Sequence, residues 1–254
     1  MKTSTKLIII LLISVPASLW AYSFLLKKRV DAHAFVLELK QEHLDENFTK
    51  KDLPPFKHVV IDGTLVMGER KNVTRFINWQ PRVTIGDYSQ SSKNTIRVLK
   101  GFEPVVKTMV SNDTLYITFS KEVPTKIKNY NEDNYYNEIA KVSIKDLRSF
   151  TGSFGQFYLN VSPDIRSLKL DMAGTGSLEL NGILLKKANI TLHDSATATL
   201  NKVKYYDLYL NLLDKSRVTV DDNSAKHFHA LQVDTGAVMI MIGKANKLKA
   251  VLDK

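Results

Sequence analysis

The chain has 254 residues and no cysteine, so a disulfide framework, a thiolate metal site and a cysteine nucleophile are all excluded. Its formal charge of +10 is concentrated at the start, because residues 1 to 29 hold five basic residues and no acidic one. The remaining +5 is spread over residues 30 to 254, where Lys and Arg are interspersed with Asp and Glu. This distribution argues against a nucleic-acid partner, which would need a basic patch or run.

The first predicted element is a membrane segment. Leu7 to Leu26 carry no charge and are flanked by Lys6 and Lys27, and such a stretch is long enough to cross a bilayer. We predict an uncleaved N-terminal transmembrane helix within residues 1 to 29. The alternative is a secretory signal that is removed. Both interpretations place residues 30 to 254 outside the cytoplasm, in the cell envelope.

Residues 30 to 56 are charged and contain Pro54 and Pro55, which predicts a stalk or linker. Residues 57 to 125 show short apolar runs with a period of two, which is typical of β-strands. The runs lie at Val59–Ile61, Leu65–Met67, Val83–Ile85, Ile96–Val98 and Leu115–Phe119. Residues 126 to 141 are rich in Asn, Tyr and acids and predict a polar loop.

From residue 142 to 254 the chain repeats with a step of about 20 residues, a period that is typical of stacked repeat architectures. One aliphatic column consists of Leu180, Leu200, Val220 and Ile240, and a second of Leu178, Ala198, Val218 and Val238. One unit slips by a residue at Leu231 and Val233, and the spacing predicts recovery at Val238. We expect both columns to face inward.

The units contain strands and polar corners but no stretch long enough for a helix, so helical and leucine-rich repeats are disfavoured. We predict an all-β fold whose C-terminal half is a short, right-handed parallel β-helix, or solenoid, in which neighbouring rungs bury one another's inward side chains. A twisted antiparallel sandwich is the alternative, but it does not require a fixed step.

Four features recur together in this chain: His58–Gly63, Leu115–Phe119, Val142–Ile144 and the repeated small-residue corners. In these features, residues 57 to 254 resemble the auto-transporter adhesin, head GIN domain family of Bacteroidota envelope proteins. It implies a β-helical repeat domain, export, an adhesive role and no established catalytic residues. Ala196 and Ser216 depart from the family, which usually has Gly at these positions.

The corners supply the first candidate site, formed by Asp194, Asp214 and Asp234. Rungs are about 4.8 Å apart, so successive carboxylates could share a Ca²⁺ ion or serve a polysaccharide lyase or hydrolase. The structural alternative is that each Asp accepts hydrogen bonds from backbone N–H groups in its own turn, which is the usual role of Asp at a corner.

The second candidate is a ligand platform of Tyr205, Tyr206 and Tyr209, since tyrosine rings can pack on sugars as well as in a core. His227 and His229 alternate with Phe228 and share a strand face, a spacing compatible with zinc. No third ligand is evident, so we predict neither a metal site nor a cofactor.

These observations together predict a membrane-anchored, extracytoplasmic and non-catalytic module for surface binding or adhesion. Its expected partners are the membrane, through Leu7 to Leu26, and an envelope or extracellular glycan or protein. A carbohydrate-active β-helix enzyme and a purely structural envelope protein are the alternatives.

Overall fold

The computed structural model describes residues 47 to 64, 80 to 86, 93 to 120, 138 to 221 and 223 to 243, all within a compact unit that begins at Asn47. The predicted membrane segment and most of the predicted polar loop lie outside these ranges. None of the described ranges contains a helix with the length and hydrophobicity needed to span a bilayer.

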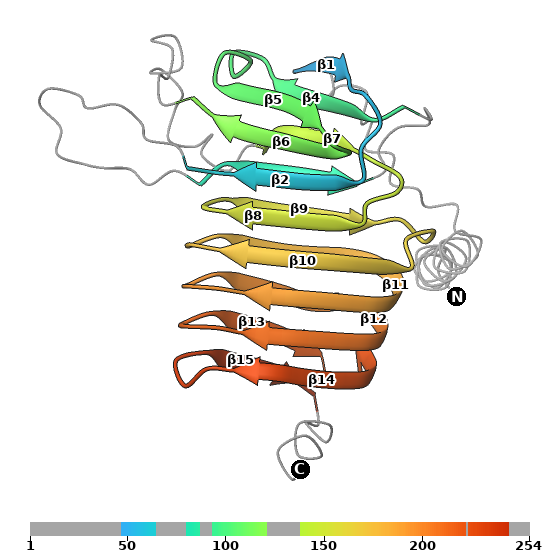
Figure 1. Ribbon diagram of the computed structural model, residues 1–254, viewed down its shortest axis with the longest axis vertical. Helices are drawn as coiled ribbons and strands as arrows, with labels where there is room; N and C mark the ends of the chain where they lie inside the picture. Colours follow the sequence, from blue (N-terminus) through green and yellow to red (C-terminus); the bar gives the residue numbers. More distant parts are fainter. Residues whose placement is uncertain (1–46, 65–79, 87–92, 121–137, 222, 244–254) are drawn as a thin grey trace, which may run out of the picture. The chain divides into compact units, whose positions relative to one another are not determined.

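Within these ranges, fifteen strands form one mostly parallel, strongly curled sheet (Figure 1). The strands are β1 (Phe48–Asp52), β2 (His58–Asp62), β3 (Arg82–Gly86), β4 (Thr95–Leu99), β5 (Val106–Ser111), β6 (Thr114–Phe119), β7 (Glu138–Ser143), β8 (Ser149–Ser153), β9 (Gln156–Val161), β10 (Ser167–Ala173), β11 (Ser177–Leu192), β12 (Thr197–Leu212), β13 (Arg217–Asp221), β14 (Ala225–Val233) and β15 (Val238–Ile242). The all-β prediction is confirmed, as are the strands at Val59, Val83, Ile96 and Leu115. The run at Leu65 lies outside the described residues.

The predicted repeat step is confirmed in the strand register. Leu170 pairs with Ile190 in parallel, and Ile190 pairs in turn with Leu210. β11 and β12 are 16 residues long, and their mutual register is irregular between Glu179 and Leu184, where the chain passes from one side of the curl to the other.

The curled sheet therefore has two sides. The first side contains β3, β9, the first halves of β11 and β12, β13 and β15. The second side contains β6, β2, β8, β10, the second halves of β11 and β12, and β14. Figure 1 shows these strands stacked along the long axis.

The parallel pairing begins well before residue 142, where we predicted the repeats to start. β2 pairs with β8 and β3 pairs with β9, both in parallel. Antiparallel pairing is confined to this end of the sheet, where β1, β4 and β5 take part. β1 lies within the range predicted as a stalk, so residues 48 to 52 of that range belong to the sheet. β7, which begins at Glu138, likewise includes the end of the predicted polar loop.

The interior is filled by the predicted aliphatic columns. Leu180, Leu200 and Val220 have no exposed surface, and Phe150 meets Phe157 edge to face with ring centroids 5.1 Å apart. Between rungs, like side chains lie next to like, so each rung completes the burial of its neighbours.

A bulge in β14 changes the register of the last rung. Leu210 pairs with Ala230, which keeps the repeat step, but Leu212 pairs with Val233, which is one position beyond it. The extra residue is accommodated around Leu231, whose side chain is 62% exposed. Such an insertion shifts every later residue by one position.

The shift is not reversed before β15, so the prediction of recovery at Val238 is wrong. Val220 pairs with Met241, and Met239 and Met241 are half-buried on the inward side. Val238 and Ile240 are instead 40% and 41% exposed. The physical reason is that a one-residue slip in a strand moves each side chain to the opposite face.

The register makes a direct prediction at adjacent positions. Replacing Leu200, which is fully buried, with Asp should lower the free energy of unfolding by about 4 kcal/mol or more, because an unpaired carboxylate would enter the core. Replacing the exposed Asn201 with Asp should change it by at most about 0.5 kcal/mol. Urea denaturation followed by circular dichroism measures both, and equal losses would contradict the register.

Candidate functional site

Aromatic and charged side chains gather on the outward side of β12 and β14. On β12, Leu208, Leu210 and Leu212 fill the core, so the alternating residues between them face outward. We call this surface the tyrosine-histidine face; it consists of Lys187, Tyr206, Asp207, Tyr209, Lys226, His227 and His229.

Tyr209 is held between its neighbours on adjacent rungs. Its ring stacks on His229 from β14, with centroids 4.4 Å apart and planes at 11°. From β11, on the opposite side of β12, the Lys187 Nζ lies 4.9 Å from the ring centroid. Since both ring faces are approached in this way, a ligand would meet the edge of Tyr209.

Tyr206 is more open, with 47% of its surface exposed. His227 meets it edge to face at 5.2 Å between centroids, and the Lys226 Nζ lies 4.6 Å from its ring centroid. These contacts fix the ring while leaving much of its surface accessible to a ligand.

Tyr205 belongs to the core, which corrects its assignment to a ligand platform. It is 2% exposed, and its hydroxyl donates to the Leu200 carbonyl at 3.3 Å. Burial raises the pKa of this phenol well above its ordinary value. The ring faces inward because β12 turns its side chains inward at this point, with Val203 and Tyr205 both buried.

Histidine and aspartate lie close together on two rungs. His229 Nε2 is 3.8 Å from Asp207 Oδ1, and His193 Nε2 is 3.3 Å from Asp171 Oδ1. His227 and His229 come from one strand as predicted, but no cluster of three or more metal-ligating residues occurs in the described part of the chain. Sequence reasoning named His229 but missed its neighbour Asp207, although alternation with the buried leucines marks Asp207 as outward.

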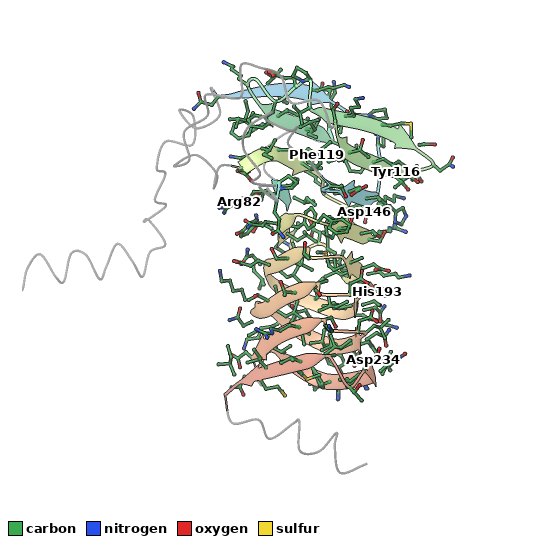
Figure 2. The ribbon with its side chains drawn as sticks, turned by 90° about the vertical axis from the view of Figure 1, so that its left-hand side faces the viewer. Arg82, Tyr116, Phe119, Asp146, His193 and Asp234 are labelled. Carbon is green, nitrogen blue, oxygen red and sulfur yellow. The ribbon has the colours of Figure 1, made fainter. Side chains whose placement is uncertain are left out.

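The corner aspartates form a ladder between rungs. Asp194 Oδ2 accepts from the Gly174 N–H at 2.9 Å, and Asp214 Oδ2 accepts from the Asp194 N–H at 3.0 Å. Asp194 and Asp214 have φ values of 55° and 56°, in the left-handed region that Asp tolerates better than most residues. Figure 2 shows the corner residues His193 and Asp234 on the same side of the ribbon.

Asp234 continues the ladder from a shifted position. Its Oδ2 accepts from the Asp214 N–H at 3.0 Å, and its Oδ1 accepts from Gln232 Nε2 at 3.1 Å. These two hydrogen bonds, the backbone one first, lower the pKa of Asp234 from its ordinary value. In the turn after β14, the Ala237 N–H donates to the Asp234 carbonyl. In the corresponding turn of the preceding rung, the carbonyl that accepts the equivalent hydrogen bond is that of Leu213. In the repeat, Asp234 is therefore equivalent to Leu213 and lies one position before the equivalent of Asp214.

The three carboxylates thus tie each rung to the preceding one. This contact is a sufficient reason for Asp at the corner, and ligand binding by the column stays a prediction.

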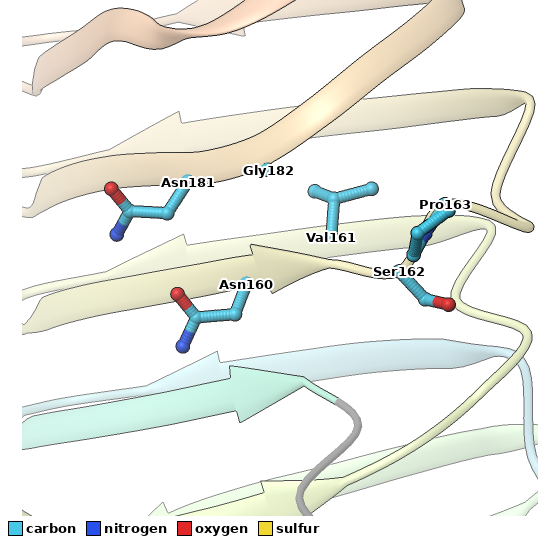
Figure 3. Close-up of a pocket in the computed structure, with 6 residues that line it drawn as sticks. All are labelled: Asn160, Val161, Ser162, Pro163, Asn181 and Gly182. Carbon is cyan, nitrogen blue, oxygen red and sulfur yellow. The ribbon is translucent and has the colours of Figure 1, made fainter. Parts of the chain in front are cut away.

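A small open pocket of about 340 Å³ lies on the first side, where β9 ends beside β11 (Figure 3). Its lining consists of Asn160, Val161, Ser162, Pro163, Asn181 and Gly182. Asn160 and Asn181 are paired in the sheet, so their amides stand on adjacent rungs. The lining offers hydrogen bonds but no titratable group, and its volume is near the lower limit for ligand sites.

No protein-family model matches the chain, and no curated protein matches its sequence. Among solved structures, it is similar to a proposed adhesin from Bacteroides fragilis, with 9% identity and a TM-score of 0.40 over 77% of this chain and 96% of that one. A proposed cell adhesion protein from Clostridium sporogenes has 13% identity and a TM-score of 0.33 over 76% and 98% of the two chains. A proposed lipid-binding protein from Parabacteroides distasonis has 9% identity and a TM-score of 0.32 over 78% and 97%. These likenesses are too distant to assign a function, and membership of the GIN domain family stays a prediction.

The ladder can be tested at Asp214. Replacing it with Ala should lower the free energy of unfolding by about 1–2 kcal/mol, because the Asp194 N–H loses its acceptor and Ala tolerates the left-handed backbone less well. The matched change to Asn keeps an acceptor oxygen and should cost at most about 0.5 kcal/mol. Urea titrations of both variants measure the difference. If Ala and Asn were equally mild, the carboxylate would have no role in joining the rungs.

Proposed function

We propose that the chain is a non-catalytic binding module of the cell envelope. In this proposal the curled sheet is a short right-handed β-solenoid, and its tyrosine-histidine face binds an extracellular glycan. The N-terminal segment from Leu7 to Leu26 holds the module in the membrane.

The observation that supports the proposal most is the mutual fixing of exposed rings across rungs. His229 stacks on Tyr209, and Lys226 and His227 hold Tyr206. Side chains already held in place lose little conformational entropy when a ligand binds, which favours affinity on an open surface.

The chemistry of the face suits a sugar. Tyr206 presents an exposed ring to the C–H groups of a pyranose, while Asp207 and Lys187 can accept from and donate to its hydroxyls. An exposed aromatic ring beside closely spaced hydrogen-bond donors and acceptors favours a glycan over an apolar ligand.

Binding can be measured with the purified protein on arrays of envelope and host-type glycans, with and without Ca²⁺. Replacing Tyr206 with Ala should weaken glycan binding by about 2- to 10-fold, because the ring contact is lost. The control is Tyr116→Ala on β6, an exposed tyrosine outside the face.

Three results would oppose this assignment. Equal effects of the two tyrosine changes would show that the tyrosine-histidine face is not the binding site. Binding to envelope proteins alone would show that the ligand is a protein and not a glycan. Release of cleaved sugar that a single Asp substitution abolishes would favour the carbohydrate-active enzyme.

The envelope location makes a separate prediction. A reporter that is active only after export, fused after Lys254, should be active, because the uncharged segment from Leu7 to Leu26 directs the rest of the chain across the membrane. The control is the same fusion with Leu11 and Leu12 replaced by Lys, which should abolish export. Activity of a cytoplasmic reporter at Lys254 in the unaltered chain would contradict the location.

A further inference from the structure

The described part of the sheet ends in an apolar edge. β14 pairs only with β12 and β15 only with β13, so within the described ranges no rung covers the last one. Val233, which continues an inward column, is 47% exposed, and Met239 and Met241 are only half-buried. As far as the described residues go, the core is therefore open at this end.

The outward side of the same edge is apolar too. Because of the one-residue slip, Val238, Ile240 and Ile242 face outward and are 40%, 41% and 48% exposed. Residues 230 to 243 contain a single charged residue, Asp234, in a chain with 24% charged residues. The apolar character therefore extends over both sides of β15 and the end of β14.

The two extremes of the sheet differ in charge. β1 has the sequence FTKKD, with three charged residues at one extreme. β15 has the sequence VMIMI and none. Exposed strand edges normally carry charges that prevent pairing with other chains, so an edge without them is suited to a strand partner.

We infer that a second copy of this chain covers this end, with β15 of one copy paired to β15 of the other. An almost uncharged edge can meet its own copy without like-charge repulsion. The free N–H and C=O groups of a strand edge are satisfied by another strand, and in a two-fold dimer the same edge supplies it.

The register specifies the contacts of this dimer. A two-fold axis perpendicular to the sheet, lying between the two β15 strands and level with Ile240, pairs them antiparallel, with Ile240 opposite Ile240 of the second copy. Met239 then lies opposite Met241 of the second copy, so that the two open cores join. Methionine suits such a junction because its flexible side chain fills irregular space.

The absence of native cysteine allows a clean test in the full-length chain. Directly opposite residues of an antiparallel pair have Cβ atoms about 4.5–5.5 Å apart, close enough for a disulfide after a small adjustment. The variant Ile240→Cys, oxidised mildly in isolated membranes, should give a covalent dimer. The control Thr219→Cys lies in the same outward column one rung earlier, between Thr199 and Ile240 of its own chain, and should stay monomeric.

A second variant tests the association without a covalent link. Ile240→Lys places two charges opposite each other and should weaken the dimer of the detergent-solubilised chain at least about 10-fold in sedimentation equilibrium, whereas Thr219→Lys should not. Melting curves of both variants confirm folding. Monomers at all concentrations without an Ile240→Cys crosslink would overturn the inference. A dimer seen only after deletion of residues 244 to 254 would overturn it as well, because the chain's own C-terminal residues would then be the cover.

Discussion

Parallel main-chain pairing between rungs one repeat apart is the interaction on which the rest of the structure depends. A single rung cannot bury its inward side chains, so each is stable only against its neighbours. The same step aligns like residues in columns. It stacks Leu170, Ile190 and Leu210 inside and brings the Asp214 carboxylate to the Asp194 N–H at the corner. The contacts of the proposed binding face follow from the same alignment.

Much of the fold could be predicted from the sequence because the step repeats residue types as well as spacing. The register of the last rung could not be predicted. In β15 every residue is apolar, so VMIMI has no alternation to show which side faces inward. Only the three-dimensional pairing shows that the extra residue near Leu231 is never compensated, which puts Met239 inside and Ile240 outside.

The site was harder to predict than the fold. Tyr205 and Tyr206 are chemically alike and adjacent, yet one is buried and the other is 47% exposed, because successive side chains of a strand point to opposite faces. The sequence does not show which of the two faces inward, because the alternation of β12 is interrupted on both sides of Tyr205, at Asn201–Lys202 and at Tyr206–Asp207. The corner aspartates were identified by type and spacing. Sequence could not show that the Oδ2 atoms of Asp194 and Asp214 each accept a backbone N–H from the preceding rung.

The central claim, a parallel coil whose rungs keep a fixed register, is tested most directly by disulfide mapping. Thr199 and Thr219 are paired on adjacent strands, about 4.8 Å apart. The double variant Thr199→Cys/Thr219→Cys should therefore form an intramolecular disulfide under mild oxidation. Thr199→Cys/Asp221→Cys, in which the second cysteine lies further along the same strand on the same face, should not. The account would be contradicted if the second pair closed and the first did not.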